Sequence, residues 1–326
     1  MITVYSHTEG RVTAREIQAG DPLPEDAIWI DLLRPSEEER AALSRAVGVA
    51  LPTESEMMEI EASSRIYQEN GASFLTATVV AKADTTRPEA GPLTFVLTPG
   101  LLVTLRFVEP KSIRIFAELV QQQPHLCDNP LETLVVLLET IVDRSADLLE
   151  GIGAHLETLS GRAFGVAGDD KPQRRAEGTL KSVLRGLGRT GDLLGKIRLS
   201  LAGFERINAY LEGLEGTQHK ALKARIKMIQ RDLSSLSQHA DFQGQRIGFL
   251  LDATLGVIGV EQNDIVKSFT VAATVFFPPT LIASIYGMNF DVMPELHWAL
   301  GYPLALVLMV VSAILPLWYF RRRGWI

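Results

Sequence analysis

Two short motifs in this sequence have spacings that could do chemistry on a nucleotide. The run GLGRTG, from Gly186 to Gly191, has the spacing of a dinucleotide-binding turn, and residues 165–171 resemble a phosphate-binding loop. The first motif requires a preceding strand, but it lies in a stretch with a helical pattern. The second has Pro172 where a serine or threonine would bind magnesium. We therefore expect no nucleotide site at either motif and no organic cofactor.

The residues that bind transition metals are too sparse for a metal enzyme. The single cysteine, Cys127, excludes a disulfide framework and a cysteine-rich zinc cluster, and no GxSxG motif is present. None of the six histidines has HExxH spacing: His7, His125, His155, His219, His239 and His297. With 32 Lys and Arg against 39 Asp and Glu, the net charge of −7 disfavours nucleic acid as a partner and favours cations. We expect a protein that is not an enzyme.

A third group of polar side chains follows an uncharged stretch near the end of the sequence. Within SIYGMNFDVMPEL, at residues 284–296, Asn289 supplies a neutral oxygen, and Asp291 and Glu295 supply carboxylates. Oxygens of these kinds are the ligands of hard cations. What they can do depends on the elements that position them.

The first part of the chain, residues 1–129, alternates short apolar runs with helical patterns, which predicts a cytosolic α/β domain. We expect one small sheet from strands at residues 2–5, 28–32, 74–82, 93–97 and 101–107. Ser36 with Glu39, and Thr53 with Glu56, have capping-box spacing and open two predicted helices, and residues 111–122 form a third. The first residues lack a secretory signal, which indicates the cytosol.

From residue 130 onward the pattern is helical only. Residues 130–216 predict paired amphipathic helices, the first ending in a loop at 165–172 and the second running from about 174 to 211. A heptad pattern begins near Thr217 and predicts a stalk helix over residues 217–267. Without a break before Pro278, the helix would continue to Tyr286 and measure about 100 Å at roughly 1.5 Å per residue.

Two stretches near the end of the sequence, residues 268–286 and 299–320, contain no charged residue. Each is long enough to cross a hydrocarbon layer of about 30 Å, so we predict two transmembrane helices joined by an external loop at 287–298. Buried core helices are the alternative. Lys267 precedes the first span and a basic tail, residues 321–326, follows the second, whereas the loop has no Lys or Arg. Both ends of the chain are therefore expected in the cytoplasm.

The segment from Tyr286 to Asn289, Tyr-Gly-Met-Asn, together with Met-Pro-Glu-Leu at 293–296 and the two terminal spans, resembles the CorA family of divalent-cation transporters. The resemblance is close over residues 240–326 and rests on the order of elements before that. It implies an α+β cytosolic domain, a long helical stalk and two C-terminal transmembrane helices, assembled as a homopentameric CorA-like funnel in the cell (inner) membrane.

The resemblance also implies roles for individual residues. Tyr286, Gly287, Met288 and Asn289 would form the outer entrance of a pore on the symmetry axis, with Thr280 and Phe277 deeper in. Val266 and Phe269 would form a hydrophobic constriction, and Asn263 an inner polar ring. Asp291 and Glu295 would concentrate cations at the entrance, or they are ordinary loop charges. The apolar positions could equally face lipid or a neighbouring helix.

The chemistry of magnesium agrees with such a pore. Mg²⁺ sheds water reluctantly, so the neutral oxygen of Asn289 suits a hydrated ion better than carboxylates that would strip and trap it. The first span has no charged residue, which favours passive conduction over a proton relay within it. A membrane potential of about 100 mV would supply roughly 4.6 kcal/mol per divalent ion, so no ATP site is required.

In the family, cytosolic Mg²⁺ bridges carboxylates of neighbouring subunits and holds the funnel closed. Asp252, 11 residues before Asn263, matches the stalk carboxylate, with Glu59 or Glu56 as its partner. A solvated acidic helix face is the alternative interpretation of residues 53–61. Loss of the bridging ions would leave like charges opposed and favour opening.

The sequence thus predicts a Mg²⁺ influx channel that also passes Co²⁺ and possibly Ni²⁺, with regulatory Mg²⁺ and the lipid bilayer as partners. Two alternatives remain open. One is a proton-coupled zinc transporter of the same superfamily. The other is a non-conducting, membrane-tethered coiled-coil scaffold or sensor.

Overall fold

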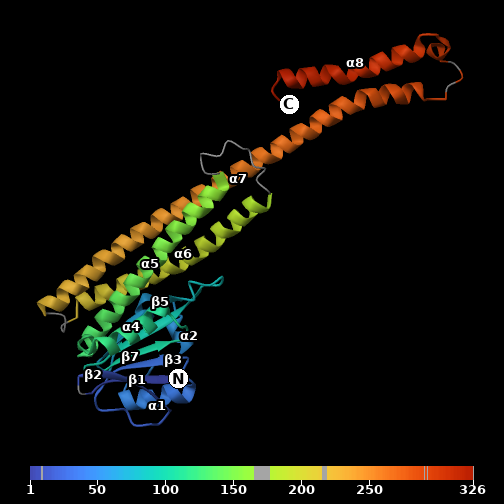
Figure 1. Ribbon diagram of the computed structural model, residues 1–326. Coiled ribbons are helices and arrows are strands. Elements are labelled where there is room, and N and C mark those ends of the chain that lie inside the picture. Colours follow the sequence, from blue (N-terminus) through green and yellow to red (C-terminus); the bar gives the residue numbers. More distant parts are fainter. Residues whose placement is uncertain (9, 165–176, 215–218, 290, 292, 326) are drawn as a thin grey trace. The chain divides into compact units, whose positions relative to one another are not determined.

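The computed structural model describes residues 1–8, 10–164, 177–214, 219–289, 291 and 293–325. The chain divides into two compact units, Met1–Leu250 and Leu251–Ile326. The first unit holds a mixed sheet and three long helical segments, and the second holds two apolar helical segments (Figure 1). This is the α+β fold with terminal apolar helices that the sequence predicts.

One seven-stranded sheet organises the first unit, in the order β2-β1-β3-β7-β6-β5-β4. Only β3 and β7 pair in parallel, and every other neighbouring pair is antiparallel. The strands are β1 (Ile2–Thr8), β2 (Arg11–Ile17), β3 (Ala27–Leu33), β4 (Ile66–Glu69), β5 (Ala72–Ala81), β6 (Glu89–Leu97) and β7 (Leu102–Arg106).

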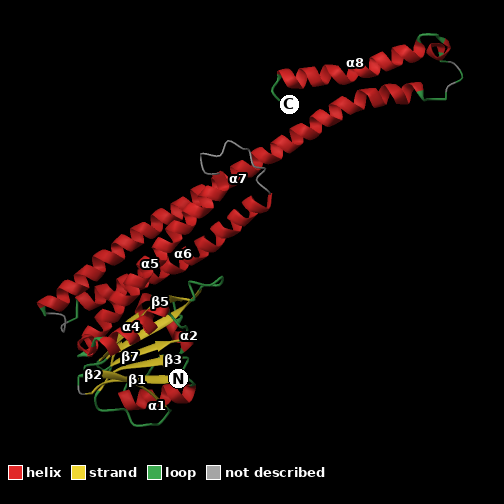
Figure 2. Ribbon diagram, in the orientation of Figure 1, coloured by secondary structure: helices red, strands yellow, loops and turns green. Residues whose placement is uncertain are grey.

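The sheet is covered on both faces, because consecutive side chains of a strand point to opposite sides. Trp29 and Phe95 belong to one apolar cluster, whereas their neighbours Ile30 and Val96 belong to the other. Helices α1 (Glu37–Val47) and α2 (Glu54–Met57) cover the second cluster, and α4 (Lys111–Gln122), α5 (Pro130–Phe164) and α6 (Glu177–Glu212) cover the first (Figure 2). Short segments α3 (Ala62–Arg65) and η1 (Pro124–Cys127) complete the unit.

A buried ion pair links the two central strands of the sheet. Arg106 on β7 donates to both carboxylate oxygens of Asp31 on β3, with the Nη2 to Oδ2 distance at 2.7 Å. Thr104 donates to Asp31 Oδ1 at 2.7 Å and accepts from the Trp29 indole at 3.0 Å. Burial and the nearby Asp31 charge raise the pKa of Tyr5, which stacks on Trp29, to about 12. The charges are stable inside the sheet because each is paired and hydrogen-bonded.

Helices α5 and α6 form a bundle with the first part of α7 (Lys220–Tyr286). This part of α7 belongs to the first unit. Arg225 on α7 donates to Glu139 on α5 at 2.9 Å, and a Cβ on Gly153 of α5 would meet Gln243 further along α7, so these two helices run in parallel. A Cβ on Gly186 of α6 would come within 2.8 Å of a Leu159 methyl on α5. The GLGRTG run therefore lies inside α6, as its helical pattern predicts, and includes a glycine at which two helices pack closely.

The predicted strands are present, but two edge strands and several boundaries differ. The sequence pattern missed β2 and β4, whose residues are largely exposed and carry polar or charged side chains, so they lack the alternation of a covered strand. The strand expected at residues 2–5 continues to Thr8 because it pairs with β2. The loop at 165–172, the start of the second amphipathic stretch and the start of the stalk at Thr217 lie outside the described residues.

The helix that begins after Thr53 is shorter than the sequence pattern suggests. Its capping box is present, with Glu56 accepting from the Thr53 backbone amide at 2.7 Å, but α2 ends after one turn at Met57. The alternative interpretation of residues 53–61 as a solvated acidic helix face therefore holds only in part, because its glutamates are exposed but the helix covers residues 54–57 alone. Met57, the last residue of α2, is buried in the second apolar cluster, and Glu59 and Glu61 lie beyond the end of the helix.

In the second unit, α7 continues to Tyr286 and is followed by η3 (Pro294–His297) and α8 (Gly301–Arg322). Among the described residues, α7 and α8 each contain a stretch long and apolar enough to cross a membrane. The second helix starts and ends two residues later than predicted, so Arg321 and Arg322 belong to its last turn. Arg322 lies over the Trp318 ring, 5.5 Å from its centroid, which places a cation and an aromatic ring together at this end.

Candidate functional site

The five residues predicted to line a pore share one side of α7. At roughly 100° per residue, they fall within an arc of about 120° around the helix axis. All five side chains are exposed in the single chain: Asn263, Val266, Phe269, Phe277 and Thr280. The same arc, extended towards the first unit, includes the exposed carboxylate of Asp252. The helix therefore presents a single stripe on which an acid, an amide, apolar side chains and a hydroxyl follow one another.

The hydroxyls of this span are hydrogen-bonded to their own helix. Thr280 donates to the Phe276 carbonyl at 2.8 Å, and Thr270 donates to the Val266 carbonyl at 2.8 Å. Each hydroxyl thereby uses its proton and keeps its lone pairs for an outside donor. Because water bound to a cation donates hydrogen bonds, such an oxygen can accept one from a hydrated ion.

A pair of prolines inside α7 adds acceptors that the sequence analysis did not consider. Pro278 and Pro279 have no N–H, so the carbonyls of Thr274 and Val275 lose their helical partners. By the same angular estimate, Thr274 lies on the side of Phe277 and Asn263. A proline pair in an uncharged span was the sequence signal for these free carbonyls.

At the end of α7, the chain turns sharply at Gly287. Its N–H donates to the Ala283 carbonyl at 3.0 Å, and a Cβ at this position would lie 3.1 Å from that oxygen. Met288 and Asn289 follow directly and are exposed. Without a side chain at Gly287, the backbone can turn close to the last turn of the helix. Asn289 therefore lies only three residues after Tyr286, the last helical residue. Asp291 is exposed beyond it, and Glu295 lies within η3.

The two candidate partners of Asp252 differ in what they already bind. Glu56 accepts hydrogen bonds from the Thr53 amide and, at 2.9 Å, from its hydroxyl, and these bonds lower the pKa of the Glu56 carboxyl. Glu59 is exposed, and its main-chain carbonyl accepts a hydrogen bond from Arg65 at 2.6 Å, whereas its carboxylate has no partner among the residues that the structure describes. Its carboxylate is therefore the more available ligand. Within the described residues, no group of three or more His, Cys, Asp or Glu side chains could hold a metal ion.

Comparison with known proteins shows the family. Residues 24–322 match the family described as CorA-like Mg²⁺ transporter protein. The chain is 33% identical to the magnesium transport protein CorA of Haemophilus ducreyi over 326 residues, which covers all of both chains. The chain belongs to the CorA-like Mg²⁺ transporter family, whose members are ion transporters and not enzymes.

Solved structures agree with this fold. The complete structure of the CorA magnesium transporter from Methanocaldococcus jannaschii superposes with a TM-score of 0.75 at 20% identity, covering 100% of this chain and 99% of that one. The cytoplasmic domain of ZntB from Vibrio parahaemolyticus gives 0.51 at 9% identity, over 79% of this chain and 97% of that domain. Both likenesses concern the fold alone.

Proposed function

We propose that this protein transports Mg²⁺ across a membrane as a homopentameric channel, with the stripe on α7 as its pore lining. Family membership supports the transport of Mg²⁺. The observation that carries the pore assignment is the stripe itself, because Asp252, Asn263 and Thr280 share one side of a helix whose last part, residues 268–286, contains no charged residue. A single pair of spans cannot enclose a conduit, so the stripe must face equivalent helices around an axis.

The outer entrance is formed by Tyr286, Gly287, Met288 and Asn289. Five amide oxygens from Asn289 would bind a hydrated ion without removing its water, and Asp291 and Glu295 would raise the local cation concentration. Deeper in the pore, Thr280 and the free Thr274 carbonyl accept hydrogen bonds from the hydration shell. The external loop lies outside the cell, and both ends of the chain lie in the cytoplasm. This is the orientation that the positive charges at Lys267 and in the basic tail predict.

The constriction lies at Val266 and Phe269, towards the cytoplasmic end of the span. Their apolar side chains are exposed in the single chain and would meet across the axis, where a narrow apolar ring excludes water and ions. Asn263 forms the polar ring below it. Opening requires these rings to separate or rotate.

Regulation acts through Asp252 and Glu59 of neighbouring subunits. A Mg²⁺ ion bridging the two carboxylates holds adjacent subunits together, and its loss leaves two like charges at one interface. Glu56 has a structural role at the start of α2 and is not a ligand in this proposal. Cytosolic Mg²⁺ therefore inhibits its own entry. Co²⁺ and Ni²⁺ pass by the same route, since neutral oxygens discriminate weakly among these ions.

Uptake into liposomes tests the entrance. The purified protein, the Asn289→Ala variant and a control with the exposed loop substitution His297→Ala are reconstituted at equal density, and Mg²⁺ entry is followed with a trapped indicator. We expect Asn289→Ala to lower uptake roughly tenfold, about 1.4 kcal/mol in barrier height, and the control to match wild type.

Other results would redirect the assignment. Unchanged uptake in Asn289→Ala would remove this amide from the pathway. Wild-type uptake at the level of empty liposomes would contradict transport and favour a scaffold. Zn²⁺ uptake that rises with an imposed pH gradient would favour a proton-coupled zinc transporter.

A further inference from the structure

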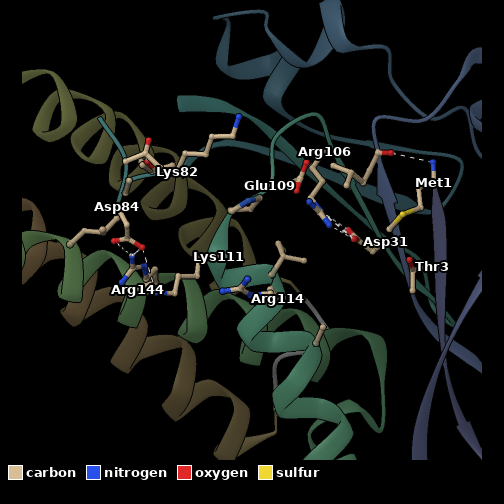
Figure 3. Close-up of a pocket in the computed structure, with 18 of the residues that line it drawn as sticks. Met1, Thr3, Asp31, Lys82, Asp84, Arg106, Glu109, Lys111, Arg114 and Arg144 are labelled. Carbon is tan, nitrogen blue, oxygen red and sulfur yellow. Dashed lines mark hydrogen bonds and ion pairs between the residues drawn. The ribbon is translucent and has the colours of Figure 1, made fainter. Parts of the chain in front are cut away.

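A cavity of about 450 Å³ is lined by residues of the first unit alone. Its walls come from β1, β3, the end of β5 with the loop after it, and the facing sides of α4 and α5 (Figure 3). Its charged lining combines five basic side chains with three acidic ones: Lys82, Arg106, Lys111, Arg114 and Arg144, and Asp31, Asp84 and Glu109. In a chain of net charge −7, this is a local excess of positive charge.

Most of these charges are already paired. Lys82 pairs at 2.8 Å with Glu89, outside the lining, and Glu109 pairs at 3.4 Å with Arg34. Asp31 is occupied by Arg106, and Asp84 is shared by two cations, Arg144 at 2.8 Å and Lys111 at 3.5 Å. Arg114 has no hydrogen-bond or ion-pair partner in the part of the chain that the structure describes. Figure 3 shows it between the Asp84–Arg144 pair and the Asp31–Arg106 pair. A guanidinium without a partner, beside a carboxylate already shared by two cations, favours an anion in the cavity.

The backbone at the rim adds to this charge distribution. Lys111 and Arg114 stand on the first turn of α4, where Pro110 provides no side-chain cap for the N–H groups. The N-terminal end of a helix carries partial positive charge, which adds to that of the two side chains. Lys82 has a φ of 52°, an uncommon value for a residue with a side chain, at the point where β5 ends in the loop beside the cavity.

The lining also has an apolar part, formed by Tyr5, Val80, Ile113 and Leu148 among others. An inorganic anion would contact only the basic side chains and leave this surface uncovered. The volume is within the range of sites that hold a small organic molecule. The lining therefore fits a ligand that has both an anionic group and a larger, less polar body.

We propose that this cavity binds an organic phosphate of nucleotide size, with Arg114 and Lys111 contacting the phosphate groups and the apolar lining contacting the organic part. Planar guanidinium groups bind phosphate oxygens in pairs, which suits Arg114 to the phosphate. The site is separate from the Mg²⁺ pathway, so its existence does not depend on the proposed transport.

Calorimetry on the full chain in detergent tests the proposal without measuring flux. ATP, inorganic phosphate and adenosine are titrated separately, with EDTA present so that no divalent metal bridges ligand and protein. We expect one ATP per chain, binding by phosphate at least tenfold weaker, and no binding of adenosine. Arg114→Gln should weaken ATP binding at least tenfold, whereas Arg185→Gln, a matched exposed arginine on α6 outside the cavity, should leave the dissociation constant unchanged.

Three results would overturn the proposal. These are absence of ATP binding to the wild type, equal affinity of wild type and Arg114→Gln, and equal affinity for phosphate and ATP, since the last would remove the role of the apolar lining. Circular dichroism melting of each variant establishes that the fold is intact. Because Arg114 is exposed and has no partner among the described residues, we expect its substitution to leave the melting temperature unchanged.

Discussion

Large apolar side chains are distributed in opposite ways in the two units of this chain. Trp29 and Phe95, in the sheet, have 0% of their surface exposed, whereas Phe269 and Phe277, in α7, have 78% and 74% exposed. The first unit buries most of its large apolar side chains with its own chain. The second cannot, so lipid and neighbouring subunits must cover its helices. Large apolar side chains therefore stabilise the fold of the first unit, whereas in the second unit they are available for insertion into a membrane and for contact with other subunits.

The largest expected effect comes from truncating one phenylalanine in each unit. Phe95→Ala removes a fully buried ring packed edge-on against Phe204, and should cost about 3–5 kcal/mol of local stability. Phe277→Ala should leave the sheet unchanged and alter Mg²⁺ uptake instead. Hydrogen exchange of peptides from β5 to β7 measures the first effect, and liposome flux the second. Equal loss of sheet protection in both variants would contradict the division of roles.

The second prediction concerns pH and the buried phenol of Tyr5. Its pKa of about 12 in the folded protein lies above the ordinary value of 10.0, so the folded state favours the neutral phenol. The resulting stability is complete below pH 10 and is lost as the pH rises towards 12, by about 2–3 kcal/mol at most. Tyr5→Phe has no proton to lose. Its unfolding free energy should fall less than that of wild type over this interval, and parallel curves would contradict the prediction.

The smallest expected effect separates two neighbouring glutamates. Glu56→Ala removes the capping acceptor of α2 and should cost roughly 0.5–1 kcal/mol of stability. Glu59→Ala should change stability by less than about 0.5 kcal/mol but weaken inhibition of uptake by cytosolic Mg²⁺. Thermal melting and flux at increasing internal Mg²⁺ distinguish the two roles. If Glu56→Ala alone weakened the inhibition of uptake by Mg²⁺, Glu56 would be the ligand and the role assigned to Glu59 would be wrong.

The sequence predicted the covered parts of the fold well, because alternation and heptad spacing directly reflect which side of an element is buried. It failed where burial is partial, at edge strands β2 and β4, and at α2, which ends after one turn at Met57. The entrance after α7 could be named from a family resemblance, since Tyr286 to Asn289 form a contiguous motif. The basic cavity could not, because Lys82, Arg114 and Arg144 are far apart in sequence and only the fold brings them together.

The proline pair in α7 has a mechanical consequence. A helix bends by lengthening hydrogen bonds on its outer side, and at Pro278 and Pro279 two of these bonds are already missing. Curvature therefore costs least there, between the apolar pair Val266 and Phe269 and the turn at Gly287. A bend in this span is therefore expected at the proline pair rather than elsewhere along the helix.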